Sequence, residues 1–492
     1  MNQPQLENPT IILSDDVTTN GNLTPLIFFS DGTLRWSDAA GEKRLILEKE
    51  VLGVSMEDSR ITLRCVVEHG GNGGILCCAT TSAMVRKSFV FQLPEDSVVI
   101  WFTKLREFLD SLGRPKRLLV LVNPYGGQRT ALNIFVDIVK PLLKDADTEI
   151  TLQETKYQLH AKEIAFELDL TMYDGVVCVS GDGILVEVIN GLLQRDDWKT
   201  AIKMPLGVIP AGTGNGVAKS LLDLVGEPCS ASYATLAILR GHKRSLDVTT
   251  VSQGKTRFFS VLMLAWGLVA DIDIESEKWR WMGSARLDLY AIKRILHLRK
   301  YNGRIHFVPA SESEDYARKI SQAVSVEELP FCSSSNMHVG SQENGYVGPN
   351  LNLEKLNWRT IEGPFISVWI HNVPWGSDDA MPAPNAKFSD GYVDVVIFKD
   401  GSKLGLLSLM TELGSGNHVK SPHVLYFKVK AFILEPGTRT TDSTKGGIID
   451  CDGEVLARGS GAYKCHEDSL MSYDKMQLTV DQGLATLFSP PT

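Results

Sequence analysis

The feature that most constrains the fold is a regular alternation of short aliphatic runs and longer amphipathic segments between residues 117 and 222. The aliphatic runs are continuous, which is typical of strands buried on both faces. Strands that alternate with helices form a parallel sheet covered by helices, and ligands bind beyond the carboxyl ends of its strands. The predicted strands are 117–122, 149–153, 175–179 and 204–209, and the predicted helices are 129–143, 160–168, 184–193 and 215–222.

Three glycine-containing loops follow three of these strands, at residues 123–129, 180–183 and 210–215. Glycine lets backbone amides approach a phosphate group without a Cβ atom in the way, and the helix that follows adds partial positive charge. One such loop often only makes a turn, but three in succession predict a nucleotide-binding site. The loops match neither the P-loop, nor the dinucleotide-binding fingerprint, nor the protein-kinase motifs.

Asp182 stands between two glycines directly after the third predicted strand. In phosphoryl transfer, a carboxylate in such a place accepts the proton of the attacking hydroxyl group. An aspartate there also suits the start of the next helix, where its side chain caps free backbone amides. Spacing alone leaves both interpretations open, a catalytic base and a helix cap.

The rest of the chain predicts two further units that are rich in β-strands. Residues 1–112 contain short β-type runs followed by one helical segment, which favours a PH-like barrel. Residues 113–244 form the α/β lobe, and residues 245–492 predict an antiparallel β-sandwich lobe with a polar insertion at 309–357. We therefore expect a parallel α/β lobe and an antiparallel sandwich lobe, preceded by a β-rich region.

Composition and charge narrow the partners and the location of the protein. A net charge of −9 argues against a nucleic-acid binder with a broad basic surface. The longest apolar run, residues 259–270, is shorter than the roughly 20 residues that span a bilayer. The first residues show no secretion signal, and the cysteines show neither zinc nor CxxC spacing. We expect a cytoplasmic protein that associates with membranes peripherally, and we predict no metal-ligating residues.

Two acidic residues, Asp271 and Asp273, follow the apolar run. On a strand, residues two apart share one face, so both carboxylates are expected to point the same way. They are either solvent-facing groups at a strand end or polar recognition groups at the mouth of an apolar pocket. The rarity of buried acids favours the first interpretation.

Residues 287–301 predict a helix with an apolar stripe, formed by Leu289, Ile292 and Leu296, and with basic residues elsewhere. One interpretation is a core helix with a solvated basic face. The other is a lid that lies on anionic lipid, or binds calmodulin, and admits a substrate.

Residues 179–193 (VSGDGILVEVINGLL) and 209–221 (IPAGTGNGVAKSL) resemble the diacylglycerol-kinase-type catalytic domain, whose general fold also occurs in NAD kinases. The SGDG sequence and residues 260–286 are similar to sphingosine kinases, and the N-terminal region is similar to their plant branch. The resemblance implies a lipid kinase that uses ATP and Mg²⁺ to phosphorylate the primary hydroxyl of sphingoid long-chain bases (sphingosine, sphinganine, phytosphingosine). The alternatives are a ceramide or diacylglycerol kinase, or a membrane- or calmodulin-binding protein with a decayed kinase site.

The resemblance also implies roles for single residues. It places the general base at Asp182 and a carboxylate that binds the lipid's amine and hydroxyl groups at Asp273. The chain departs from animal relatives at Tyr125 and Gln128, where basic residues are common, so backbone amides and arginines are expected to contribute more. The implied nucleotide-binding residues are Asn123, Gly126, Gly127, Thr155, Ser180, Gly181, Gly183, Glu187, Gly212, Thr213, Asn215, Arg280, Arg286, Asp452, Gly453 and Glu454. The implied lipid-binding residues are Leu268, Val269, Asp271 and Asp273.

Overall fold

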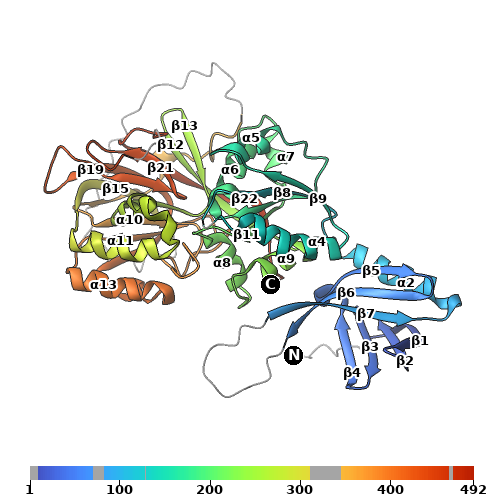
Figure 1. Ribbon diagram of the computed structural model, residues 1–492. Helices are drawn as coiled ribbons and strands as arrows, with labels where there is room; N and C mark the ends of the chain where they lie inside the picture. The colour runs from blue at the N-terminus through green and yellow to red at the C-terminus, as the bar shows by residue number, and fades with distance from the viewer. Residues whose placement is uncertain (1–8, 70–82, 128, 311–344, 465–468, 492) are drawn as a thin grey trace, which may run out of the picture.

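The described part of the chain contains one antiparallel sheet near the N-terminus and one long mixed sheet that runs through the remaining two lobes (Figure 1). The computed structural model describes residues 9–69, 83–127, 129–310, 345–464 and 469–491. Most of the predicted insertion and Gln128 lie outside these ranges, as does the side chain of Arg280. The fold class predicted from the sequence is confirmed.

The N-terminal unit is a seven-stranded antiparallel sheet in the order β4-β3-β2-β1-β7-β6-β5. Helix α2 (Glu95–Ser111) packs on this sheet and buries Val98, Trp101, Leu105 and Leu109, whose spacing puts them on one helix face. Strands closed by one terminal helix are the arrangement that the sequence predicts for this region. Its other elements are β1 (Ile11–Thr19), β2 (Asn22–Phe29), β3 (Thr33–Asp38), β4 (Gly41–Ile46), α1 (Leu47–Glu50), β5 (Val51–Glu57), β6 (Arg60–His69) and β7 (Ala83–Gln92).

The next lobe is the predicted parallel sheet, with strands in the order β11-β10-β8-β9. Every residue of the central strand β10 is buried, which explains its continuous aliphatic sequence. The predicted helix at 129–143 is two α-helical pieces joined by a π-helical turn. The elements are β8 (Arg117–Val122), α3 (Ala131–Ile134), η1 (Phe135–Val139), α4 (Lys140–Asp145), β9 (Glu149–Glu154), α5 (His160–Glu167), β10 (Gly175–Ser180), α6 (Asp182–Leu193), α7 (Trp198–Ala201), β11 (Leu206–Pro210), α8 (Gly216–Asp223) and α9 (Ala231–Arg240).

The second lobe is built from antiparallel strands, in the order β21-β20-β14-β17-β18-β19-β22, with β12, β13, β15 and β16 paired at its side. Its core is rich in β-branched and aromatic side chains, which suit a pleated, buried surface. The strands are β12 (Lys243–Gln253), β13 (Thr256–Ser260), β14 (Met263–Gly267), β15 (Tyr301–Pro309), β16 (Arg359–Glu362), β17 (Ser367–His371), β18 (Val393–Phe398), β19 (Val424–Arg439), β20 (Ile448–Cys451) and β21 (Glu454–Arg458).

The C-terminal strand β22 (Met476–Phe488) joins the two lobes into one sheet. It pairs antiparallel with β12 and β19 and parallel with β11, where Leu487 lies opposite Leu206. The last strand of the chain therefore extends the parallel sheet into the sandwich. The unit boundaries predicted from the sequence stay a prediction.

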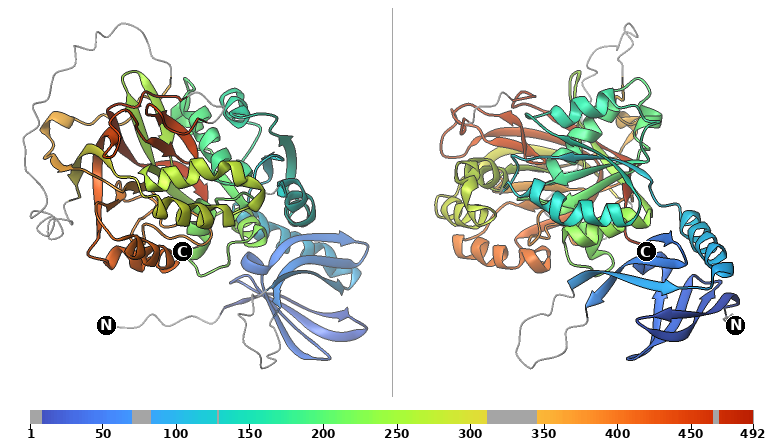
Figure 2. Two further views of the ribbon diagram at one scale, coloured as in Figure 1. Left: turned by 60° about the vertical axis from the view of Figure 1, so that its left-hand side comes forward. Right: turned by 45° about the vertical axis from the view of Figure 1, so that its right-hand side comes forward.

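Helices α10 (Leu268–Ser276), α11 (Ala285–Leu296) and α13 (Lys403–Thr411) lie together on the outer side of the second lobe (Figures 1 and 2). The prediction that Asp271 and Asp273 lie on a strand is wrong, because both belong to α10. Strand β14 ends at Gly267, whose φ of 91° turns the chain into the helix. Residues two apart on an α-helix are separated by about 200° around its axis, so the two carboxylates point in different directions.

Helix α11 does not bury the stripe that its sequence suggests. Its buried side chains include Arg286, Tyr290 and Ile295, whereas the predicted apolar stripe at Leu289, Ile292 and Leu296 is exposed. Helix α11 is therefore not the predicted core helix with a buried apolar stripe and a solvated basic face. In the described residues, no helix has the length and apolar character required to cross a bilayer.

Candidate functional site

A pocket of about 850 Å³ lies between the α/β lobe and the sandwich lobe. One end is lined by the loops that follow β8, β10 and β11, where backbone amides and polar side chains predominate. The other end is lined by apolar side chains of α10, α11 and α13. A single pocket thus offers a polar end at the carboxyl edge of the parallel sheet and an apolar end in the second lobe.

The glycine loops touch one another through their backbones. A Cβ atom added to Gly212 would lie 2.3 Å from the Cα atom of Gly181, and one added to Gly127 would lie 3.1 Å from the carbonyl carbon of Gly212. Gly127 also has a φ of 52°, in the left-handed region that glycine favours. The three loops can therefore converge only because these positions carry no side chain.

Two asparagine side chains shape these loops. The Asn123 carboxamide oxygen accepts hydrogen bonds from the backbone amides of Tyr125 and Gly126, at 3.0 and 3.1 Å. The Asn215 oxygen accepts one from the Gly212 amide, at 3.0 Å, and its nitrogen donates to Asp378. Both side chains thus hold the turns in place from within.

Asp182 joins the second loop to the third. It is the first residue of α6, it is 4% exposed, and its two oxygens accept hydrogen bonds from the backbone amides of Gly216 (2.6 Å) and Val217 (3.0 Å). These amides open α8, so Asp182 caps that helix and not the one to which it belongs. Burial raises the pKa of Asp182 to about 7, although the two amides act in the opposite direction. The carboxyl can therefore gain and lose a proton near neutral pH.

Other acidic residues near the polar end brace the pocket walls. Glu187 of α6 accepts a hydrogen bond from the Ala161 amide at the start of α5, and burial raises its pKa. Asp452 accepts bonds from the amides of Val261, Leu262 and Met263 and from the Ser260 hydroxyl, and burial raises its pKa to about 6. Both carboxylates thereby fix the positions of neighbouring backbone segments.

Glu454 links the two lobes across the pocket. Its carboxylate accepts a hydrogen bond of 2.8 Å from the side chain of Gln158, which lies in the loop between β9 and α5. Gly453, before it, has a φ of 85° in the turn between β20 and β21. The turn at 452–454 therefore reaches back to the α/β lobe.

Asp273 and Arg286 also line the pocket. A guanidinium nitrogen of Arg286 lies 3.5 Å from an Asp273 carboxylate oxygen and also pairs with Glu277. Arg286 is buried, whereas the Asp273 side chain is 23% exposed. The carboxylate of Asp273 is consequently the more accessible partner of this pair.

Asp271 faces away from the pocket. Its side chain is 2% exposed and accepts hydrogen bonds from the Tyr301 hydroxyl (2.6 Å) and from Arg299 (3.2 Å). Burial raises the pKa of Asp271, while Arg299 opposes that rise. These contacts attach α10 to the start of β15, and the predicted contact of Asp271 with lipid stays a prediction.

Most of the residues predicted from the sequence line this one pocket, although they come from segments far apart in the chain. Asn215 and Asp271 are not among its lining residues. Those that line it are Asn123, Gly126, Gly127, Thr155, Ser180, Gly181, Asp182, Gly183, Glu187, Gly212, Thr213, Leu268, Val269, Asp273, Arg286, Asp452, Gly453 and Glu454.

Sequence reasoning missed part of the apolar wall. Helix α13 contributes Leu406, Leu409 and Met410, and β17 contributes Trp369. Residues 403–411 carry the apolar run that could have predicted such a helix. No local signal indicates that α13 packs against α11, because that contact joins segments more than 100 residues apart.

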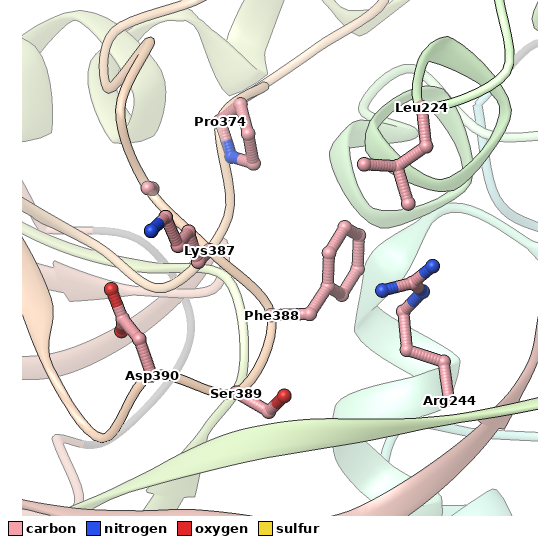
Figure 3. Close-up of a pocket in the computed structure, with 8 residues that line it drawn as sticks. Leu224, Arg244, Pro374, Lys387, Phe388, Ser389 and Asp390 are labelled. Atoms are coloured by element: carbon pink, nitrogen blue, oxygen red, sulfur yellow. The ribbon is translucent and has the colours of Figure 1, made fainter. Parts of the chain in front are cut away.

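A second pocket of about 250 Å³ lies beyond the end of α8 (Figure 3). Its Arg244 guanidinium stacks over the Phe388 ring at 5.7 Å, and Asp390 is paired with Lys428. It contains none of the residues predicted from the sequence. The larger pocket is therefore the candidate site.

Comparison with known proteins identifies the family of the chain. Residues 117–251 match the diacylglycerol kinase catalytic domain, and residues 359–471 match the YegS C-terminal NAD kinase beta sandwich-like domain. The chain is 56% identical to Sphingosine kinase 2 of Arabidopsis thaliana over 100% of both chains. The chain belongs to the sphingosine kinase family.

More distant members of the family align with a smaller share of the chain. Sphingosine kinase 1 of Homo sapiens is 32% identical over 70% of this chain and 87% of that protein. Sphingoid long chain base kinase 4 of Schizosaccharomyces pombe is 31% identical over 69% of this chain. Membership of this family confirms the enzyme class predicted from the motifs, a lipid kinase.

A substitution at Gly183 tests the predicted nucleotide binding separately from folding. Gly183 lies in the first turn of α6, and a Cβ atom there would meet no atom within 4 Å. We expect Gly183→Ala to leave the free energy of unfolding unchanged or to raise it by up to about 1 kcal/mol. Because the methyl group would enter the polar end of the pocket, the KM for ATP should rise roughly tenfold, about 1.4 kcal/mol of binding.

Gly212→Ala provides the contrast, because its Cβ atom would collide with Gly181. This variant should lose stability as well as ATP binding. Thermal unfolding and ATP-dependent kinetics measure the two effects. An unchanged KM for ATP in Gly183→Ala would contradict the placement of phosphate groups at this loop.

Proposed function

We propose that the protein transfers the γ-phosphoryl group of ATP to the primary hydroxyl of a sphingoid long-chain base. The observation that carries this proposal is that one pocket is lined by the glycine loops, by Asp182 and Asp273, and by apolar side chains of α10, α11 and α13. Membership of the sphingosine kinase family supports the same substrate class. A phosphate donor and a lipid acceptor could therefore meet within one cavity.

At the polar end, the phosphates of ATP would lie against the backbone amides of the three loops and the first turns of α6 and α8. The N-terminus of a helix carries partial positive charge, which stabilises phosphate oxygens, although the first amides of α8 are already bonded to Asp182. Asp182 would accept the proton of the lipid hydroxyl as that oxygen attacks the γ-phosphorus. A carboxyl with a pKa of about 7 suits this role, because it can hold the transferred proton and release it near neutral pH.

Mg²⁺ is expected to accompany ATP. Over the described ranges, no group of three or more His, Cys, Asp or Glu side chains is arranged to hold a metal ion. Mg²⁺ is commonly bound by substrate phosphates together with one or two carboxylates, so it would reach this pocket with the phosphates of ATP. When bound, the ion would neutralise phosphate charge.

At the apolar end, the hydrocarbon chain would pack among the side chains of α10, α11 and α13. The amine of a sphingoid base is protonated at neutral pH, and the Asp273 carboxylate offers it a charge-assisted hydrogen bond. Neutral diacylglycerols have no cation to gain from this contact, and ceramides carry an amide in its place. Asp273 would therefore favour sphingoid bases over both.

A panel of lipids tests the proposed substrate class. With labelled ATP, the protein should phosphorylate sphingosine, sphinganine or phytosphingosine in preference to ceramide and diacylglycerol. Asp273→Asn should lower kcat/KM for sphingoid bases by about 1–3 kcal/mol, roughly 5- to 150-fold, and leave the KM for ATP unchanged. Preferential labelling of ceramide or diacylglycerol by the wild-type protein would refute the substrate assignment.

The role of Asp182 predicts a dependence on pH. Because a general base acts in its deprotonated form, kcat/KM should rise with pH through an inflection near 7, where the Asp182 carboxyl loses its proton. Asp182→Asn should lower kcat by roughly 10²- to 10⁴-fold and abolish that inflection. ATP binding to the variant, measured by calorimetry, is the control, and near-normal turnover would exclude Asp182 as the base.

We further propose that the exposed apolar face of the second lobe rests on an anionic membrane surface. This face consists of Leu289, Ile292 and Leu296 of α11 with Trp281 and Leu404, which are 82% and 80% exposed. Lys293 and Lys403 lie beside it in the sequence of the same helices. Large exposed apolar side chains next to basic ones are typical of helices that lie in a lipid interface.

Calmodulin, the other candidate partner of residues 287–301, is less well supported. It binds helices that it can surround, whereas α11 buries Arg286, Tyr290, Arg294 and Ile295 in the lobe. Release of the helix would break the ion pair between Arg294 and Glu275. The lipid surface needs no such unpacking.

Serine substitutions at Leu289, Ile292 and Leu296 test the membrane proposal. Sedimentation with vesicles that contain anionic lipid should fall at least about tenfold, because the substitutions remove the apolar side chains that would be buried in the lipid interface. Serine substitutions at Val136, Leu152 and Phe166, which are similarly exposed on the α/β lobe, should have no effect. Unchanged vesicle binding, or Ca²⁺-dependent capture by calmodulin through residues 287–301, would overturn the proposal.

A further inference from the structure

Asp450 is a fully buried carboxyl beneath the apolar end of the pocket. It lies in β20, where its neighbours across the sheet are Ala265 of β14 and Val455 of β21. Side chains alternate between the two faces of a strand. Ile449 and Cys451 enter the core of the sandwich, whereas Ile448, Ala265 and Val455 belong to the apolar cluster that packs under α10. Asp450 therefore points to the face that α10 covers.

Neither oxygen of Asp450 receives a hydrogen bond from any donor among the residues that the structure describes. An ionised carboxylate without a partner is very unfavourable in such a place, so the group is expected to be neutral. Burial and the neighbouring Asp273 carboxylate raise the pKa of Asp450 well above its usual value. A protonated carboxyl carries one donor, and the acceptor that faces it is the carboxylate of Asp273.

Charged side chains approach Asp450 and Asp273 from several elements. Arg286 of α11 approaches Asp273 at 3.5 Å and shares its charge with Glu277. From the turn between β20 and β21, Asp452 and Glu454 add negative potential at Asp450. Among the described side chains, Arg286 is thus a cation that competes with a ligand for Asp273, and the nearby acids disfavour a second negative charge on the pair.

We propose that Asp450 is a positioning residue for the lipid headgroup, a protonated carboxyl that donates a hydrogen bond to Asp273. A short acidic side chain next to a guanidinium tends to turn into a bidentate pair with it. The hydrogen bond from Asp450 keeps the Asp273 carboxylate from forming a bidentate pair with Arg286. It leaves lone pairs of the Asp273 oxygens directed into the pocket. An ammonium group then meets a carboxylate that is already oriented, and less conformational freedom is lost on binding.

This inference rests on the proposed function, because it concerns how Asp273 receives the amine of a sphingoid base. It adds a residue that does not line the pocket and that acts through another side chain. The inference requires a donor at position 450 and does not require a negative charge there. Amide and apolar replacements separate these two properties.

Steady-state kinetics with sphingosine and ATP test the proposal on the full chain. Asp450→Asn keeps an N–H donor of the same shape, and its KM for sphingosine should stay within about threefold of the wild-type value. Asp450→Ala and the nearly isosteric Asp450→Leu lack the donor, and their KM for sphingosine should rise about 5- to 20-fold. Their kcat at saturating lipid and their KM for ATP should not change.

Cys451→Ala is the matched control, because it removes a buried side chain from the opposite face of the same strand. It should leave the KM for sphingosine unchanged. A wild-type KM in both Asp450→Ala and Asp450→Leu would overturn the inference. An Asp450→Asn variant with a KM for sphingosine as high as that of Asp450→Leu would also overturn it. A fall in kcat and in ATP binding together with a lower Tm in Asp450→Ala and Asp450→Leu would overturn it too, because it would indicate a structural role alone.

The same assay distinguishes this inference from the function on which it rests. A wild-type protein that phosphorylates no sphingoid base would refute the proposed function and the inference with it. A wild-type protein that does so, with variants at position 450 that do not differ from it, would refute the inference alone.

Discussion

The pair of hydrogen bonds from the amides of Gly216 and Val217 to the Asp182 carboxylate holds the candidate site together. These bonds tie the end of β10 to the start of α8, and the glycine loops can then approach one another within backbone contact. The same burial that makes this contact strong raises the pKa of Asp182 to about 7. One side chain therefore supports the geometry of the polar end and has the proton affinity that the proposed chemistry requires.

The apolar end depends on a different set of buried charges. Glu275 of α10 accepts hydrogen bonds from Tyr290 and Arg294 of α11 and from Arg299, and Asp271 accepts one from Tyr301. Removal of one member would leave the others buried without a partner, which is strongly destabilising. This network fixes α10 and α11 against the sandwich and so sets the place of Asp273 on the pocket wall. The Asp273 carboxylate is accessible because its side chain is 23% exposed on the pocket wall, whereas Glu275 and Asp271 bind donors within the lobe.

Local sequence patterns predicted the α/β lobe well and failed around α10 and α11. Short aliphatic runs such as β10, which alternate regularly with amphipathic helices, indicate parallel strands that are buried on both faces. The apolar run before Asp271 suits a strand or a buried helix equally, and it divides at Gly267, where the positive φ ends β14. In α11, paired arginines occupy the interior and leucines face outward, because ion pairs with Glu275 and Glu277 offset the burial of Arg294 and Arg286. The spacing of apolar residues along the sequence cannot indicate such buried ion pairs.

The sequence by itself determined the parallel sheet, the three glycine loops and the family, and it indicated Asp182 as a catalytic base or a helix cap, because each of these depends on residues close together in the chain. Tertiary structure decided what those residues face. It brought the turn at 452–454 to the glycine loops, turned Asp271 away from Asp273, and exposed the apolar stripe of α11. It also placed Asp450 beneath Asp273, a contact between residues 177 positions apart. Long-range contacts of this kind arise from the packing of α10 on the sandwich sheet, which no local pattern encodes.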